Sequence, residues 1–223
     1  MRVGIVAEGR GDLAVIVNIV KGVLDIDSSD ITLLLPEYEY DQTDLAVMPV
    51  EAFSNWTLVK SKCQNRDTLK AFLDINEDAF LIIQIDTAER GEIGYDVNEP
   101  TDKNASNYCD CLRKNVILKI NEWLENNFSD KIVYAISIEE TEAWIMTLYD
   151  EKNTSKSADP KKKLDYILNS KLLNKDRFIL SEKNEFKKMK KLSADFSKRK
   201  RLNSVKDNNR SLSLFCESLE SFQ

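Results

Sequence analysis

The chain contains no histidine among its 223 residues. It can therefore form no Ser–His or Cys–His nucleophile pair, no histidine general base and no histidine-rich metal site. Cysteine is also scarce: Cys63, Cys109, Cys111 and Cys216 are scattered, and one residue separates the middle pair where a zinc knuckle has two. Reduced thiols are the expected state. Any catalytic chemistry would rest on carboxylates, lysines or a hard metal ion.

Long apolar runs are missing as well. No run reaches the length needed to cross a membrane, and the N-terminus leads directly into a strand pattern. We therefore expect no signal peptide, no membrane span and a cytoplasmic location. Hydrophobic residues make up 42% of the chain and charged residues 31%, which is typical of a globular protein rather than a disordered one. The length suits one large domain, or one domain with an appendage.

Acidic and basic residues are distributed unevenly along the chain. Residues 1–150 contain 28 acidic and 13 basic side chains, a net charge of −15. Residues 151–223 contain 10 acidic and 19 basic side chains, a net charge of +9. This asymmetry favours a division into two parts. We expect an α/β domain at residues 1–150 and a basic helical extension at residues 151–223.

A buried strand is predicted at the centre of the first part. The run FLIIQID at residues 80–86 is apolar until it reaches its final aspartate, apart from one glutamine. Such a run is typical of a strand buried on both faces of a parallel sheet. Similar apolar runs at residues 2–7, 31–35 and 131–137 are separated by helical patterns. The expected fold is α/β, a mostly parallel sheet of about four strands flanked by helices, with a loop or insertion at residues 36–65.

Carboxylates follow three of the predicted strands. Glu8, Asp86 and Glu142 come at or shortly after strand ends, and Glu89 and Glu92 lie in the loop beyond Asp86. In open α/β sheets, chemistry is found beyond the carboxyl ends of the strands. Clustered carboxylates repel one another unless a cation offsets them, and oxygen ligands suit Mg²⁺ or Mn²⁺. The alternative is that these residues only cap helices or meet helix dipoles.

The same stretches resemble a known family. VGIVAEGRGD, LIIQIDTAE and ISIEETEAWI are similar to the strand–Glu–Gly, strand–Asp and strand–Glu segments of the Toprim domain of topoisomerases, primases and OLD-type nucleases. The resemblance covers residues 1–150 and implies a Toprim-like Rossmannoid fold with metal-dependent phosphodiester hydrolysis. It implies that Glu8 acts as general acid/base or metal ligand, Asp86 as primary ligand and Glu142 as a further ligand. It also implies an anti-phage defence or toxin role.

One position departs from the family pattern. The Toprim domain has Asp-x-Asp after its third strand, whereas this chain has Asp86-Thr87-Ala88. Two explanations stay open from the residues. The natural site is degenerate or uses Glu89 or Glu92 in place of the missing aspartate, or Ala88 is an engineered substitution that traps an inactive protein.

A dense basic stretch marks the second part of the chain. Eight basic residues and one acidic residue lie within fifteen positions. Such a cluster favours binding to a phosphate backbone, because the binding releases counterions. The alternative is a solvated helix face, or a patch that pairs with the acidic part of the chain. The predicted nucleic-acid-binding residues are Lys187, Lys188, Lys190, Lys191, Lys198, Arg199, Lys200 and Arg201, and Phe186 and Phe196 are candidates for stacking on bases.

Together these features predict a Mg²⁺- or Mn²⁺-dependent nuclease that acts on DNA or RNA. A second hypothesis is a non-catalytic Toprim-like interaction module that works with a partner ATPase, which Ala88 favours. A third is a metal-dependent enzyme for a small phosphorylated substrate, which would use Tyr38, Tyr40 and Trp56 in the predicted insertion. Homo-oligomerisation is compatible with each of them.

Overall fold

Four parallel strands form the centre of the protein, as the sequence predicts. The computed structural model describes residues 1–36, 56–150, 152–171 and 177–222. The strands β1 (Arg2–Val6), β2 (Ile31–Leu35), β3 (Ala79–Asp86) and β4 (Ile132–Ser137) make one sheet in the order β2-β1-β3-β4, and every pair is parallel. The carboxyl ends of the strands therefore meet at one edge of the sheet.

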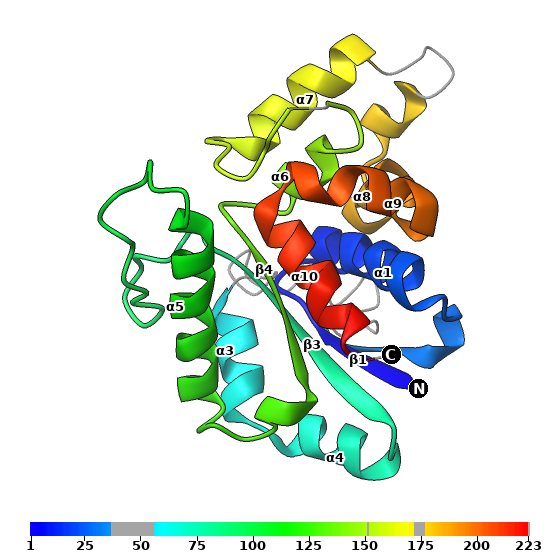
Figure 1. The fold of residues 1–223 in the computed structure, drawn as a ribbon. Coiled ribbons are helices and arrows are strands. Elements are labelled where there is room, and N and C mark those ends of the chain that lie inside the picture. The colour runs from blue at the N-terminus through cyan, green and yellow to red at the C-terminus, as the bar shows by residue number, and fades with distance from the viewer. Residues whose placement is uncertain (37–55, 151, 172–176, 223) are drawn as a thin grey trace.

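Helices cover both faces of this sheet. They are α1 (Arg10–Leu24), α3 (Trp56–Gln64), α4 (Asp67–Ile75), α5 (Tyr108–Trp123), α6 (Glu142–Met146), α7 (Pro160–Lys171), α8 (Glu185–Leu192), α9 (Arg199–Val205) and α10 (Arg210–Glu220). Figure 1 shows α3, α4 and α5 on one side of the sheet, and α1 and α10 on the other with α8 and α9 above them. The result is a three-layer α/β arrangement. None of the described helices has both the length and the apolar content that a membrane crossing requires.

Strand β3 shows why the sheet separates two cores. Its side chains alternate in direction, as in any strand. Phe80 and Ile82 belong to the core beneath α1 and the C-terminal helices, whereas Leu81, Ile83 and Ile85 belong to the core beneath α3, α4 and α5. Both sets are buried, which explains the uninterrupted apolar run in the sequence.

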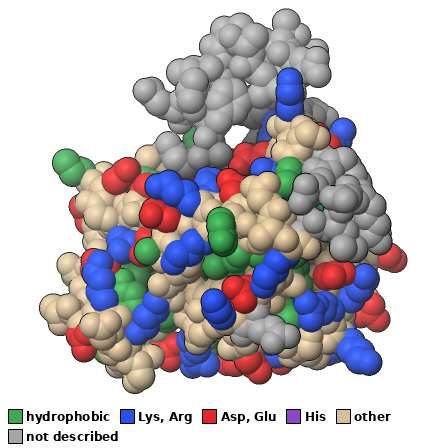
Figure 2. All heavy atoms as spheres, turned by 90° about the horizontal axis from the view of Figure 1, so that it is seen from above, with side chains coloured by type: hydrophobic (Ala, Val, Ile, Leu, Met, Phe, Trp, Pro, Cys, Tyr) green, Lys and Arg blue, Asp and Glu red, His purple; other side chains and the backbone are tan. Residues whose placement is uncertain are grey.

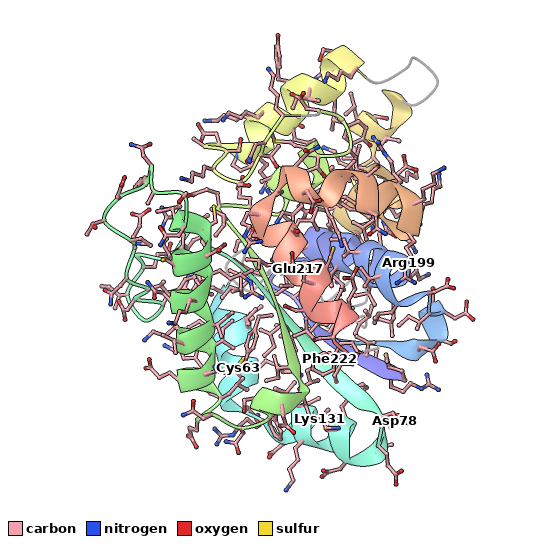
Figure 3. The ribbon with its side chains drawn as sticks, in the orientation of Figure 1. Cys63, Asp78, Lys131, Arg199, Glu217 and Phe222 are labelled. Atoms are coloured by element: carbon pink, nitrogen blue, oxygen red, sulfur yellow. The ribbon has the colours of Figure 1, made fainter. Side chains whose placement is uncertain are left out.

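The core beneath α1 extends across position 150. All the described elements between residues 160 and 220 are helical, in agreement with the prediction. Their buried side chains, among them Met189, Phe196 and Phe215, belong to the same core cluster as Val3 and Ile16. At the end of the chain, the ring of Phe222, labelled in Figure 3, lies 4.8 Å from that of Phe80. The C-terminal helices therefore complete the layer that α1 begins.

A close approach fixes how the N-terminal and C-terminal parts meet. Gly22 on α1 faces the backbone of Phe196, and a Cβ atom added to Gly22 would lie 1.9 Å from the Phe196 carbonyl oxygen. Only glycine permits this contact between a helix and a neighbouring backbone.

One local prediction needs correction. Residues 36–65 were predicted to be a loop or insertion, but Trp56–Gln64 forms helix α3, and residues 37–55 lie outside the described residues. The helix forms because Trp56, Val59 and Cys63 make one buried face at helical spacing. The segment after β4, ISIEETEAWI in the sequence, forms only the short helix α6 at Glu142–Met146.

Candidate carboxylate site

The parallel sheet brings the ends of β1 and β3 into direct contact. The backbone N–H of Asp86 donates a 2.9 Å hydrogen bond to Oε2 of Glu8. The backbone N–H of Glu8 in turn donates to Oε1 of Gln84 at 2.8 Å, and Nε2 of Gln84 donates to Oδ1 of Asp86 at 2.9 Å. Gln84 is fully buried, and it is the polar interruption in the apolar run of β3. It holds the two acidic residues in a fixed relation, a role that the sequence did not suggest.

Glu8 is buried, and its pKa lies well above that of an ordinary glutamate. Burial raises the pKa of Glu8 to about 8, and the charges of Asp12 and Glu89 act in the same direction. The hydrogen bond from the backbone of Asp86 opposes this shift. A carboxyl group with a pKa near the working pH can both accept and donate a proton.

Asp86 lies at the centre of a carboxylate cluster whose other members are Glu8, Asp12 and Glu142. Burial is the largest cause that raises the pKa of Asp86 well above its usual range, and the charges of Asp12 and Glu8 add to it. The hydroxyl of Ser137, at the end of β4, donates to Oδ1 of Asp86. The hydroxyl of Tyr95 donates to the backbone oxygen of Asp86 at 2.9 Å. These contacts fix the carboxylate at the junction of β3 and β4.

Asp12 is a member of the cluster that the sequence reading missed. It lies in the first turn of α1, four residues after Glu8, and accepts a hydrogen bond from the hydroxyl of Thr141. Burial raises the pKa of Asp12, and the charge of Glu185 on α8 raises it further. The spacing was a usable signal, because a residue in the first helical turn after a strand end lies beside that strand end.

Glu142 lies on α6, beside the only described cation in ion-pair contact with the cluster. Burial raises the pKa of Glu142 to about 7, Lys161 opposes this shift and Asp12 adds to it. Nζ of Lys161 is 3.8 Å from an oxygen of Glu142 and 3.8 Å from one of Glu140. Although burial lowers the pKa of Lys161, the charges of Glu142, Glu140 and Glu185 raise it above its ordinary value. The lysine therefore stays charged.

The two glutamates in the loop after Asp86, Glu89 and Glu92, affect the carboxylate cluster unequally. Burial raises the pKa of Glu89, and its charge acts on Glu8. Glu92 instead accepts a 2.8 Å hydrogen bond from the indole N–H of Trp56, so it ties the loop to α3. Ala88 is exposed, and its backbone N–H donates to the carbonyl oxygen of Glu139 at 3.2 Å. Of the two predicted substitutes for a second aspartate, Glu89 is the one whose charge is felt by the cluster.

Among the residues that the structure describes, no three acidic or cysteine side chains are arranged to hold one metal ion. The hydrogen bonds explain part of this, because Ser137 and Gln84 both occupy Oδ1 of Asp86 and the Asp86 backbone occupies Oε2 of Glu8. The donor set itself fits a hard cation, since every ionisable side chain of the cluster is a carboxylate.

The predicted basic stretch covers α8, the N-cap of α9 and α9 itself. Several of its members are engaged locally. Nζ of Lys191 lies 3.5 Å from Glu182, Nζ of Lys198 lies 2.7 Å from Asp195, and Lys190 lies over the ring of Phe186. The face drawn in Figure 2 shows basic side chains interspersed with acidic ones rather than a patch of one sign.

The basic stretch also differs from the prediction in its aromatic residues. Phe196 is fully buried in the core and is not available to stack on bases. Arg201 donates from Nη2 to the backbone oxygen of Leu148 at 2.8 Å, so it braces the fold. Lys187, Lys198, Arg199 and Lys200 are exposed.

One hollow is lined by a residue from each of the two predicted sites. It has a volume of ≈ 380 Å³ and lies between α6, α7 and α8, with Glu142, Lys161, Glu185 and Lys188 among its lining residues. Lys188 of the basic stretch therefore shares a concave surface with Glu142 of the carboxylate cluster.

The aromatic residues of the third hypothesis do not form a described ligand site. Trp56 is buried, and its ring stacks on Tyr95 at 5.4 Å and on Trp123 at 6.3 Å between ring centroids. It is a core residue. Tyr38 and Tyr40 lie outside the described residues.

Comparison of the chain with protein-family models, curated proteins and solved structures finds no match in any of the three. The resemblance to the Toprim domain therefore stays a prediction from the sequence.

Proposed function

We propose that this protein is a divalent-metal-dependent phosphodiesterase of Toprim type that hydrolyses nucleic acid. The supporting observation is the accumulation of Glu8, Asp12, Asp86 and Glu142 at the edge of the sheet where β1, β3 and β4 end. Of the described cations, Lys161 alone makes an ion pair with any of the four. Buried carboxylates that share so little positive charge are unfavourable unless a cation binds among them.

The residues that would hold Mg²⁺ or Mn²⁺ are Asp86 and Glu8, with Asp12, Glu142 and Glu89 near enough to affect their charge. Mg²⁺ usually takes one or two carboxylates and completes its coordination with water and phosphate oxygens, so a cage of three protein ligands is not required. When bound, such an ion polarises the phosphate and lowers the pKa of a coordinated water.

The chain supplies the proton and charge chemistry around this centre. In its ionised form, Glu8 can take a proton from an attacking water and later return it to the leaving oxygen. Lys161 and Lys188 line the hollow together with the carboxylates of Glu142, Asp165, Glu182 and Glu185, and the two lysines are the groups that could hold a phosphate there. The exposed lysines of α8 and α9 provide further positive charge that a bound nucleic-acid strand could contact. A defence or toxin role rests on the family resemblance alone.

The experiment is a calorimetric Mn²⁺ titration of this chain and of its Ala88→Asp, Asp86→Asn and Glu122→Gln variants, with nuclease activity measured on each. Glu122 is an exposed carboxylate of α5 and serves as the matched control. We expect binding and cleavage that Asp86→Asn abolishes and Glu122→Gln preserves. If only Ala88→Asp binds and cuts, the centre is a Toprim nuclease disabled at position 88.

If the chain cuts and Glu89→Gln abolishes cleavage, Glu89 has replaced the second aspartate. If neither the chain nor Ala88→Asp binds Mn²⁺, the proposal is wrong. The second candidate, an interaction module that acts with a partner ATPase, then gains support. Two observations favour that candidate: Ala88 stands at the ligand position, and no three described carboxylates are arranged around a common ion site.

A further inference from the structure

A larger hollow lies away from the carboxylate cluster. It has a volume of ≈ 800 Å³, within the range of small-molecule sites, and lies between the start of α5, the segment 153–157, α7 and α10. None of Glu8, Asp12, Asp86 and Glu142 lines it. Its described lining is polar except for one cysteine: hydroxyls, an amide and charged groups. Such a lining suits a hydrophilic ligand.

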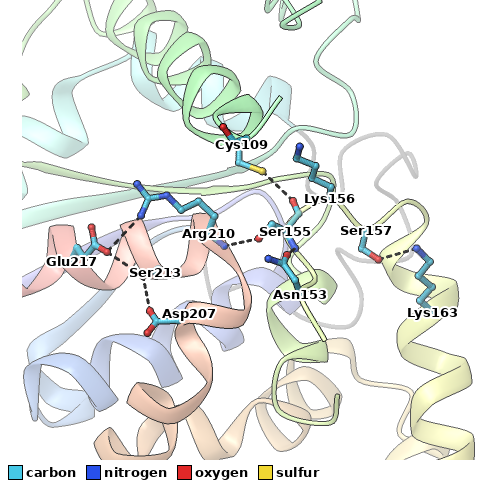
Figure 4. Close-up of a pocket in the computed structure, with 11 residues that line it drawn as sticks. Cys109, Asn153, Ser155, Lys156, Ser157, Lys163, Asp207, Arg210, Ser213 and Glu217 are labelled. Carbon is cyan, nitrogen blue, oxygen red and sulfur yellow. Dashed lines mark hydrogen bonds and ion pairs between the residues drawn. The ribbon is translucent and has the colours of Figure 1, made fainter. Parts of the chain in front are cut away.

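One side of the hollow is cationic (Figure 4). Nζ of Lys163 donates to the hydroxyl of Ser157 at 3.1 Å, and Nζ of Lys156 donates to the backbone oxygens of Lys103 and Ala105 at 3.0 and 2.6 Å. Among the described residues, no carboxylate lies within ion-pair distance of either lysine. Arg210 differs, because Asp110 holds its Nε and Nη2 atoms at 2.9 and 3.1 Å. Nζ of Lys156 also lies 5.6 Å from the centre of the Tyr108 ring. The two lysines therefore bring to the hollow positive charge that no described carboxylate neutralises.

The opposite side is acidic. Asp207 and Glu217 share the hydroxyl of Ser213, which lies 3.0 Å from Oδ1 of Asp207 and 3.1 Å from Oε1 of Glu217. Figure 4 places these two carboxylates across Arg210 from Lys156 and Lys163. A ligand that is anionic throughout would be repelled on this side. A ligand whose far end carries hydroxyl groups would donate hydrogen bonds to the carboxylate oxygens.

We propose that this hollow binds a phosphorylated sugar, with the phosphate against Lys156 and Lys163 and the sugar hydroxyls against Asp207 and Glu217. No aromatic side chain is among the described residues that line it, so a base would find no stacking partner there. The ligand recognised is therefore the sugar phosphate itself. It can come from a free nucleotide or from the phosphorylated end of a nucleic-acid strand. The proposal does not depend on metal binding at the carboxylate cluster.

The test is calorimetry with ribose 5-phosphate in the presence of a chelator, so that no metal-bound phosphate contributes heat. We expect Lys163→Gln and Lys156→Gln each to weaken binding about 10-fold, as loss of a charged hydrogen bond does. Lys162→Gln is the matched control, because Lys162 is the neighbour of Lys163 on α7 and its side chain is 83% exposed. Thermal unfolding verifies that each variant is folded. If ribose 5-phosphate does not bind at millimolar concentration, or if all three variants weaken binding equally, the proposal fails.

Two further probes examine the acidic side and the source of the ligand. Inorganic phosphate should bind more weakly than ribose 5-phosphate, and Asp207→Asn should reduce that difference. Equal affinity for the two probes would overturn the assignment of the sugar. A tetranucleotide with a 5′-phosphate that binds as tightly as ribose 5-phosphate supports a strand end as the source. If this tetranucleotide binds much more weakly, a free nucleotide is the supported source.

Discussion

Two charged regions of this protein differ in sign and in how far their side chains are buried. The carboxylates at the edge of the sheet are buried or partly buried, and burial raises the pKa of Glu8, Asp12, Asp86 and Glu142. The basic residues of α8 and α9 are mostly exposed or paired with nearby acids. Charges in water interact weakly and are screened, whereas buried charges of one sign store unfavourable energy. Burial, rather than the number of charges, therefore decides which region has shifted pKa values.

The largest effect should come from neutralising the centre of the carboxylate cluster. Asp86→Asn removes one charge but keeps the shape of the side chain. If the proposed chemistry is correct, cleavage should fall by about 10²–10³-fold, the range seen when one electrostatic stabiliser is removed. Without metal, the same variant should unfold at a higher temperature, because a repelling charge is gone. A variant that loses activity and also unfolds at a lower temperature would contradict this account of Asp86.

The pH dependence of stability should report the same buried charges. The pKa of Glu8 rises from 4.5 to about 8 and that of Glu142 from 4.5 to about 7. Between these values the folded state holds protons that the unfolded state has lost, so the free energy of unfolding falls as the pH rises from about 4.5 to about 8. We expect a decrease of several kcal/mol in metal-free buffer, because each unit of pKa shift corresponds to about 1.4 kcal/mol.

Urea unfolding at a series of pH values measures this decrease. Glu8→Gln should flatten the profile, and Glu122→Gln should leave it unchanged. Added Mn²⁺ should stabilise the protein most above pH 8, where the carboxylates are ionised. If the free energy of unfolding of the unmodified chain does not change with pH, the pKa values of the buried carboxylates are not raised as described.

The contact between α1 and the C-terminal helices is testable through glycine. Gly22→Ala places a methyl group against the Phe196 carbonyl, so the two segments must move apart, at a cost of about 1–3 kcal/mol. Gly91→Ala is the control, since no atom lies within 4 Å of the added methyl group. Chemical unfolding of both variants measures the difference. Equal stability of the two would mean that the C-terminal helices do not rest on α1.

The smallest effect should come from two lysines of α8, of which Lys187 is exposed and Lys188 is half-buried at the hollow beside Glu142. The double variant Lys187→Glu and Lys188→Glu should weaken nucleic-acid binding and lower the salt dependence of the affinity, by about 0.9 in slope for each phosphate that the protein no longer neutralises. The control is the same charge change at Lys70 and Lys114, exposed residues of α4 and α5 on the opposite face. Binding measured at several salt concentrations distinguishes the pairs. If both double variants lose affinity equally, α8 does not form a specific nucleic-acid-binding surface.

The sequence predicted the strand ends well and the side-chain network poorly. Glu8, Asp86 and Glu142 were predicted to lie together because apolar runs reveal strands and parallel strands place their ends at one edge of the sheet. Gln84 and Asp12 were missed because their roles arise only from neighbours on other elements, although Gln84 interrupts the apolar run of β3 and Asp12 lies in the first turn after β1. Phe196 was misjudged because a phenylalanine between charged residues looks exposed in the sequence, whereas α1 covers it in the fold.

What the sequence determined by itself is the α/β class, the parallel sheet and the absence of histidine chemistry, because periodicity and composition are local properties of the chain. Only the tertiary structure decided three other matters. It placed the helices beyond residue 150 on α1, it brought Glu89 rather than Glu92 into the electrostatic field of Glu8, and it set Lys156 and Lys163 opposite Asp207 and Glu217. Each depends on contacts between residues far apart in the chain, which no local pattern records.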